Sequence, residues 1–203
     1  PKDVDLITEQ ISKIDANASV VKLANGNDLA YDLLIIATGS KTNYFGNKEI
    51  ERNAMSMKTI PQSLNIRSLI LENFEQAVLL KDETERNALM NFVIVGGGPT
   101  GVELAGALAE IKKGILPKDY PDLDTRSAQI HIVQSGDCIL KGMSGKASAK
   151  AEDFLEKLGV NIWKNVRVTS YDGKTVTTNT DLTFETATLV WAAGVKGATI
   201  KGL

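Results

Sequence analysis

Short apolar runs separated by turn residues fill the first 40 positions. The pattern predicts a strand over Val4–Ile14 and a second over Val20–Leu23, and Asn25-Gly26 is typical of a hairpin turn. The run Leu33–Ala37 is apolar at every position, as in a strand buried on both faces. We therefore expect a small β segment ending in a buried strand, followed by a polar, Asn-rich loop to about Pro61.

Helical periodicity alternates with short apolar strands from Ser63 onward. Apolar residues recur at three- and four-residue steps over 66–78, 104–111 and 147–158, which predicts three helices. Strands are expected at Phe92–Val95, Ile130–Val133, Val160–Trp163 and from Leu189, with Asp172-Gly173 as a hairpin signal in a β excursion before the last strand. The order β-α-β-α-β predicts an α/β fold, a Rossmann-type parallel sheet with a β-hairpin, preceded by the N-terminal β segment.

A glycine-rich turn follows the strand at 92–95 and opens the next helix. Gly96, Gly98 and Gly101 match G-x-G-x-x-G in the strand-turn-helix context that gives this motif meaning. The three glycines are expected to allow the tight turn, the close approach of a pyrophosphate and the packing of the helix, in that order. The helix N-terminus near Thr100 would attract phosphates. The competing interpretation is a turn that merely connects two elements.

Two polar residues near this turn are candidates for contacts with a nicotinamide dinucleotide. Gln134 stands where a Rossmann strand normally carries the acidic residue that binds the ribose. It can hydrogen-bond a ribose but does not repel a 2′-phosphate, and no basic residue follows before Lys141. We therefore expect NADH to bind better than NADPH, by a smaller margin than a carboxylate gives. Glu103 either compensates the helix dipole or approaches the cofactor, and both readings stay open.

Composition excludes several other classes of function. The net charge of -2, with 43% apolar and 24% charged residues, gives no case for a nucleic-acid partner. The single cysteine, Cys138, excludes an internal disulfide, a CxxC pair and a cysteine-rich metal site, and the single histidine, His131, is predicted to be a strand residue and not a catalyst. We predict no catalytic side chain and no metal ligand. Without a bilayer-length apolar run or a signal peptide, the expected location is cytoplasmic.

Taken together, these segments resemble the type II NADH:quinone oxidoreductases of the pyridine nucleotide-disulfide oxidoreductase superfamily. Tyr31–Ser40 is similar to the segment where such chains leave the flavin domain for the NAD domain, and Gly96–Gly106 matches the second dinucleotide motif. The insertion with Tyr120-Pro121 and the segment Trp191–Val195 are also similar to theirs. The resemblance covers nearly the whole chain.

The resemblance implies domains, cofactors and site residues. Residues 1–40 would be a partial flavin-domain segment and residues 41–203 an NAD(H)-binding Rossmann domain. The implied cofactor-binding residues are Thr38, Gly39, Gly96, Gly98, Pro99, Thr100, Gly101, Glu103, Gln134, Ala193 and Gly194. In the parent protein, an FAD-dependent NADH dehydrogenase of the respiratory chain, NADH would pass a hydride to FAD and the flavin would reduce a quinone, with the redox chemistry supplied by the cofactors.

Three segments of the family have no counterpart in this sequence: the first glycine-rich motif, the later Gly-Asp segment of the flavin site and the C-terminal membrane-docking part. We therefore interpret the chain as an NAD(H)-binding fragment that is inactive by itself. An NAD(P)H-dependent flavin reductase with a protein electron acceptor and a non-catalytic nucleotide-binding module remain alternatives. A homodimer, and peripheral attachment of the parent to the inner face of the cytoplasmic membrane, are also left open.

Overall fold

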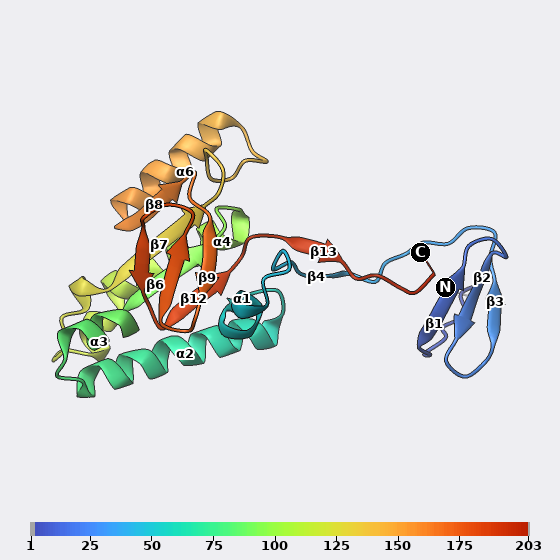
Figure 1. The fold of residues 1–203 in the computed structure, drawn as a ribbon, viewed down its shortest axis with the longest axis horizontal. Helices are drawn as coiled ribbons and strands as arrows, with labels where there is room; N and C mark the ends of the chain where they lie inside the picture. The colour runs from blue at the N-terminus through green and yellow to red at the C-terminus, as the bar shows by residue number, and fades with distance from the viewer. Residues whose placement is uncertain (1–2, 203) are drawn as a thin grey trace. The chain divides into compact units, whose positions relative to one another are not determined.

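The computed structural model describes residues 3–202, which divide into two compact units (Figure 1). One unit consists of the residues up to Lys41 together with those from Val195 onward, and the other is Thr42–Gly194. The family resemblance implied a single boundary between residues 40 and 41. The structure groups the last residues with the first unit, so the chain leaves that unit once and returns to it. The assignment of the two units to a flavin and an NAD domain stays a prediction.

The first unit is built on a three-stranded antiparallel sheet of order β1-β2-β3. Its strands are β1 (Ile11–Asp15), β2 (Val20–Leu23) and β3 (Asp28–Ala30), and β4 (Ser40–Thr42) pairs with β13 (Val195–Gly197) in a separate two-stranded sheet. The predicted hairpin at Asn25-Gly26 is confirmed: it joins β2 to β3, and Gly26 has a φ of +90°. A small core holds the sheet together, formed by Ile14, Val21 and Leu23.

Two strand predictions in this unit are wrong. The strand expected from Val4 begins only at Ile11, and Leu33–Ala37 forms no strand at all. The side chains of Leu33 and Ile35 are each 82% exposed. An apolar run becomes a buried strand only where neighbouring strands pair with its backbone and other layers cover its faces. Among the described residues, no neighbouring strand pairs with 33–37.

The second unit contains a five-stranded parallel sheet of order β5-β12-β6-β7-β8. Its strands are β5 (Met55–Ser56), β6 (Asn91–Val95), β7 (Gln129–Gln134), β8 (Val160–Lys164) and β12 (Thr188–Trp191). A three-stranded antiparallel sheet is formed by β9 (Val168–Tyr171), β10 (Thr175–Thr178) and β11 (Thr183–Glu185). The predicted α/β class and the β excursion before the last strand are confirmed.

Helices and short helical turns connect these strands (Figure 1). They are α1 (Lys48–Asn53), α2 (Ile60–Leu79), α3 (Glu83–Leu89), α4 (Pro99–Gly114), α5 (Leu116–Asp119), a 3-10 turn (Thr125–Ser127) and α6 (Gly145–Lys157). The loop predicted to run to Pro61 in fact holds α1 and β5. Periodicity missed α1 because this short helix buries only Ile50 and starts from a cap, in which the Asn47 side chain accepts a hydrogen bond from the Ile50 N–H (3.0 Å).

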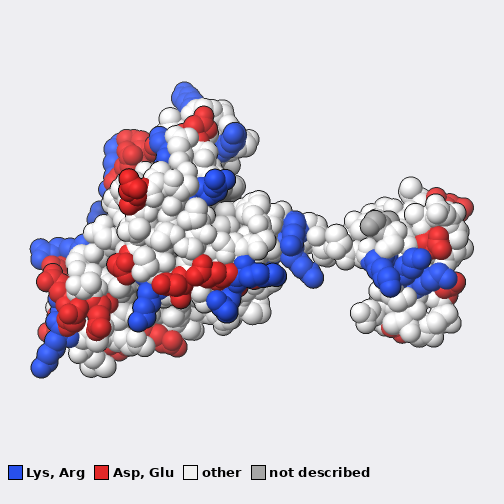
Figure 2. Space-filling view, viewed as in Figure 1, with Lys and Arg blue, Asp and Glu red and all other residues white. Residues whose placement is uncertain are grey.

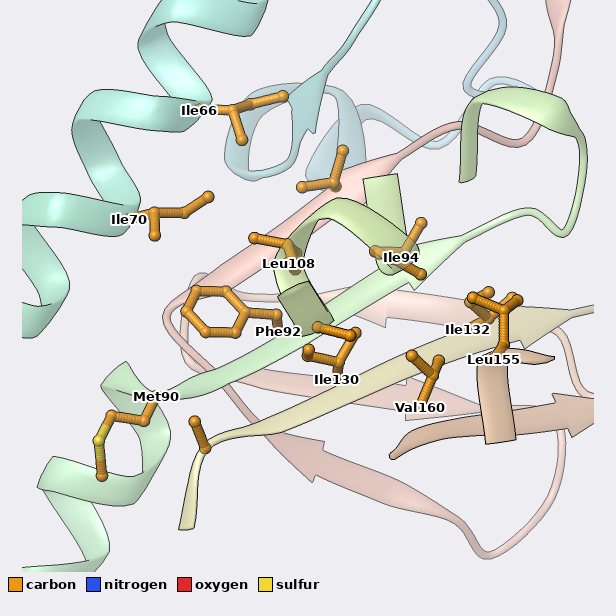
Figure 3. Close-up of a cluster of buried hydrophobic side chains, with 14 of the residues drawn as sticks. Ile66, Ile70, Met90, Phe92, Ile94, Leu108, Ile130, Ile132, Leu155 and Val160 are labelled. Atoms are coloured by element: carbon orange, nitrogen blue, oxygen red, sulfur yellow. The ribbon is translucent and has the colours of Figure 1, made fainter. Parts of the chain in front are cut away.

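The parallel sheet is covered on both faces, and strand alternation decides which residue meets which layer. On β6, Phe92 and Ile94 belong to the core shared with α2, α4 and α6 (Figure 3). Val93 and Val95 belong to a second core, shared with the antiparallel sheet. Burial on both faces explains why the parallel strands appear in the sequence as continuous apolar runs.

The surface charges are mixed, and none of the described helices is of the membrane-spanning kind. Lysines and arginines alternate with acidic side chains on the face drawn in Figure 2, without forming one continuous basic surface there. None of the helices within residues 3–202 combines the length and the apolar character needed to cross a membrane.

Candidate nucleotide-binding site

A cavity of about 770 Å³ opens at the carboxyl ends of the parallel strands in the second unit. It is lined by Tyr44, Phe45, Asn47, Ile50, Val95, Gly96, Gly98, Val133, Gln134, Ser135, Val166, Arg167, Val168, Thr169, Trp191, Ala192, Ala193 and Gly194. These residues come from the carboxyl ends of β6, β7 and β12 and the loops after them, from the segment that joins β8 to β9 and the start of β9, and from the segment before β5. Four of the predicted site residues therefore lie together with Gly96: Gly98, Gln134, Ala193 and Gly194.

The position of the cavity follows from the order of the strands. From β6 the chain moves outward through β7 to β8, and then returns to place β12 on the other side of β6. The loops after β6 and β12 consequently diverge above the sheet. Open α/β sheets bind ligands at such a switch point, outside the carboxyl ends of the strands.

Two of the three motif glycines are required by the protein's own packing. Gly96 has a φ of +110°, and a Cβ there would lie 2.8 Å from the carbonyl oxygen of Ala192. A Cβ on Gly101 would collide with the carbonyl oxygen of Gly96. The backbone of the turn thus lies directly against Ala192, after β12, and against the first turn of α4. A larger residue at either glycine would have no room and would disturb the fold itself.

Gly98 differs from the other two glycines. A Cβ at this position would meet no protein atom within 4 Å, and its φ of -77° suits any residue. Gly98 is also the N-cap of α4, where no side chain caps the free N–H groups of the first turn. Open space beside uncapped helix N–H groups is the arrangement that accepts a phosphate, so this part of the cavity fits the pyrophosphate of a dinucleotide.

Gln134, at the carboxyl end of β7, contacts the glycine turn directly. Its Oε1 accepts a hydrogen bond from the Gly97 N–H (2.8 Å), a contact that the sequence did not predict. Oε1 already accepts from Gly97, and the Nε2 amide, which can only donate, is the group that no described residue binds. A carboxylate at this position would still accept the bond from Gly97. Its second oxygen would place a negative charge where Gln134 offers the ligand an N–H donor.

Replacing Gln134 with glutamate is therefore expected to weaken NADPH binding relative to NADH by about 1–2 kcal/mol, the scale of one unfavourable polar contact. The Gly97 N–H keeps its acceptor in Gln134→Glu, so the fold should not change. Calorimetric titration of both nucleotides into parent and variant measures the effect. Equal discrimination in the two proteins would mean that Gln134 does not contact the adenosine ribose.

Aromatic side chains form the end of the cavity beside Ala193 and Gly194. The Trp191 indole donates to the carbonyl oxygen of Asn43 (2.9 Å), and the rings of Tyr44 and Phe45 lie 5.9 and 6.5 Å from the Trp191 ring. Gly194 has a φ of +124°. The sequence missed Tyr44 and Phe45 because they fall in a segment interpreted as a polar loop, although two adjacent aromatic residues there were an available signal.

The remaining predicted site residues lie apart from the cavity. Pro99 lines a smaller adjoining cavity of about 340 Å³, which Lys141 also lines, while Thr100 and Glu103 line neither of the two. Thr38 and Gly39 belong to the first unit, where the Thr38 hydroxyl donates to the Ala198 carbonyl oxygen (2.8 Å) and the Ala198 N–H donates to that of Gly39 (3.0 Å). Cofactor contacts by all these residues stay predictions.

The family model for pyridine nucleotide-disulphide oxidoreductases matches residues 1–201. This chain therefore belongs to the pyridine nucleotide-disulphide oxidoreductase family. Its similarity is to the type II branch that the sequence pattern indicated. A type II NADH:quinone oxidoreductase NdhA of Mycobacterium tuberculosis is 35% identical over 201 residues, which are 96% of this chain and 43% of that protein. The recognition made from the sequence is confirmed.

Two further relatives agree with this placement. The mitochondrial external alternative NAD(P)H-ubiquinone oxidoreductase B1 of Arabidopsis thaliana is 34% identical over 174 residues, covering 82% of this chain and 30% of that protein. The structure of NDH2 from Plasmodium falciparum in complex with NADH superposes with a TM-score of 0.82 at 25% identity, covering 95% of this chain and 41% of that one. The chain thus spans less than half the length of each of these relatives.

Proposed function

We propose that this chain is the NAD(H)-binding part of an FAD-dependent NADH dehydrogenase, which passes a hydride from NADH to FAD and electrons onward to a quinone. The observation that carries the proposal is the cavity at the switch point, which is lined by the glycine turn, where Gly98 is open, and by Ala193 and Gly194. The NADH named in the Plasmodium structure and the quinone named in the relatives support it.

The residues present fit the two ends of a dinucleotide. The uncapped N–H groups of α4 would hold the pyrophosphate, and the Nε2 group of Gln134 would donate to the adenosine ribose. The aromatic wall at Trp191 would exclude water around the nicotinamide, the ring that supplies the hydride when NADH is bound. This chain's residues therefore bind and orient the cofactor, and no side chain of the cavity is required to move a proton.

The residues present do not make an FAD site. An FAD site of this kind would need a second strand-turn-helix glycine motif. Within residues 3–202 there is one such motif, which starts at Gly96 and lines the cavity described above. Thr38 and Gly39 alone supply no cradle for a second dinucleotide. The FAD and the quinone of the proposed reaction accordingly require segments beyond those described, and no step through either group is assigned to this chain.

The purified chain is expected to bind NADH without retaining flavin. Titration should give a dissociation constant between roughly 1 μM and 1 mM, the usual range for enzyme substrates, because the whole dinucleotide cleft lies within the second unit. The absorption spectrum after gel filtration should lack the flavin band near about 450 nm. Absence of NADH binding up to several millimolar would refute the proposed function, whereas a flavin band would refute only the assignment of the FAD site to other segments.

A further inference from the structure

The cavity carries one formal positive charge on its described lining. Among the described residues that line the cavity, Arg167 is the one with a formal charge, and no aspartate or glutamate lines it. Asp137 follows shortly after Gln134 in the sequence and could have supplied a repelling carboxylate, but it lines neither the main nor the adjoining cavity. A ligand in the cavity therefore meets a cation and hydrogen-bond donors.

Backbone pairing places Arg167 beside Gln134 although 33 positions separate them in the chain. The Val166 N–H donates to the carbonyl oxygen of Gln134 (3.1 Å), and the Asn165 N–H donates to that of Gly136 (2.9 Å). The segment just before Arg167 thus runs along the loop that follows β7. A Cβ built on Gly136 would lie 3.0 Å from Gln134 Nε2, so the free end of the Gln134 amide lies against Gly136, whose carbonyl oxygen accepts the bond from Asn165.

The backbone N–H and carbonyl oxygen of Arg167 are both hydrogen-bonded, whereas its side chain is not. Its N–H donates to Asn179 Oδ1 (2.6 Å), and its carbonyl oxygen accepts from the Asn179 N–H (2.9 Å). Within the part of the chain that the structure describes, the guanidinium forms no ion pair or hydrogen bond, and the residue is exposed. Arg167 is therefore positioned by β9–β10 and free to bind an anion.

We propose that Arg167, together with the Gln134 amide, forms a subsite for a phosphate on the adenosine ribose, so that this chain binds 2′-phosphorylated nucleotides such as NADPH as well as NADH. The subsite rests on the proposed function, because it presumes that the adenosine end of the dinucleotide lies at Gln134. A guanidinium and an amide both donate, and a phosphate offers three acceptor oxygens with about one and a half to two negative charges. Accepting such a group usually takes an arginine near the ribose.

The test compares nucleotides that differ by this phosphate alone. Calorimetry measures NADPH against NADH, and adenosine 2′,5′-bisphosphate against AMP, on the parent chain and on Arg167→Gln, which removes the charge and keeps most of the side chain. The variant should lose about tenfold in affinity for both 2′-phosphorylated ligands, the value of one charge-assisted hydrogen bond, while NADH and AMP change by less than about twofold. Arg167→Lys should restore part of the loss.

Lys141 provides the matched control, because it is an exposed cation that lines only the adjoining cavity. Lys141→Gln should leave the NADPH-to-NADH ratio within about twofold of the parent's. A shift in that ratio for Lys141→Gln and not for Arg167→Gln would overturn the proposal. Equal losses for all four ligands in Arg167→Gln would also overturn it, since the arginine would then contact a part that they share. Failure of the parent chain to bind NADH would instead refute the proposed function itself.

Discussion

Replacing Gly98 with valine is expected to abolish NADH binding and leave the fold intact. The two charge-assisted hydrogen bonds that a pyrophosphate makes at such a turn are worth about 1.5–3 kcal/mol each, so their loss weakens binding about a hundredfold or more. The fold survives because a Cβ at Gly98 meets no protein atom within 4 Å and the residue has an ordinary φ of -77°. We expect the free energy of unfolding to change by no more than about 1 kcal/mol, the usual range for an N-cap position.

Gly101→Ala is the matched control for this prediction. Its added Cβ collides with the carbonyl oxygen of Gly96, inside the turn itself. The control should therefore lower the free energy of unfolding as well as NADH binding, whereas Gly98→Val lowers binding alone. Urea unfolding and NADH titration of both variants separate the two effects. If Gly98→Val bound NADH as tightly as the parent chain, the cofactor would have to lie elsewhere.

Stability is expected to fall by about 2–3 kcal/mol between pH 7 and pH 4 because of His131. This side chain lies on β7, is 8% exposed and packs with its ring centroid 4.9 Å from that of Phe184. Burial lowers its pKa from 6.5 to about 4, and its Nδ1 accepts a hydrogen bond from the Trp163 indole (3.1 Å). At pH 7.5 the ring is almost entirely neutral in both states. As the pH falls toward 4, the unfolded chain binds the proton first, so the folded state loses stability.

His131→Gln tests this assignment, because glutamine can accept the Trp163 hydrogen bond but does not titrate. Urea unfolding followed by tryptophan fluorescence at pH 7.5, 6, 5 and 4.5 gives the free energy of unfolding for both proteins. The variant should be less stable than the parent at pH 7.5 and should lose less stability between pH 7.5 and 4.5. The same decline in both proteins would assign the pH dependence to other groups. Asp124 and Asp172, whose pKa values are lowered by hydrogen bonds in the folded state, contribute to the loss only below about pH 5 and do so equally in both proteins.

The local pattern was sufficient for the parts of the molecule whose partners are close in sequence. Gly96, Gly98 and Gly101 follow one strand and start one helix, so their spacing alone predicted the turn. The hairpin at Asn25-Gly26 was likewise predicted, because it needs only a residue that accepts positive φ. The parallel sheet followed from apolar runs at regular intervals, and His131 was correctly placed in a strand.

Only the tertiary structure decided the features that depend on distant segments. The sequence predicted Gln134 as the ribose position, but the bond from Gly97 that engages its Oε1 arises where β6 and β7 end side by side. Arg167 reaches the same end of the cavity through pairing of its segment with the loop after β7, and no local pattern carries that information. Leu33–Ala37 shows the converse. An apolar run indicates only that burial of its side chains would be favourable. A strand forms where other segments supply hydrogen-bond partners for its backbone, and among the described residues no strand pairs with 33–37.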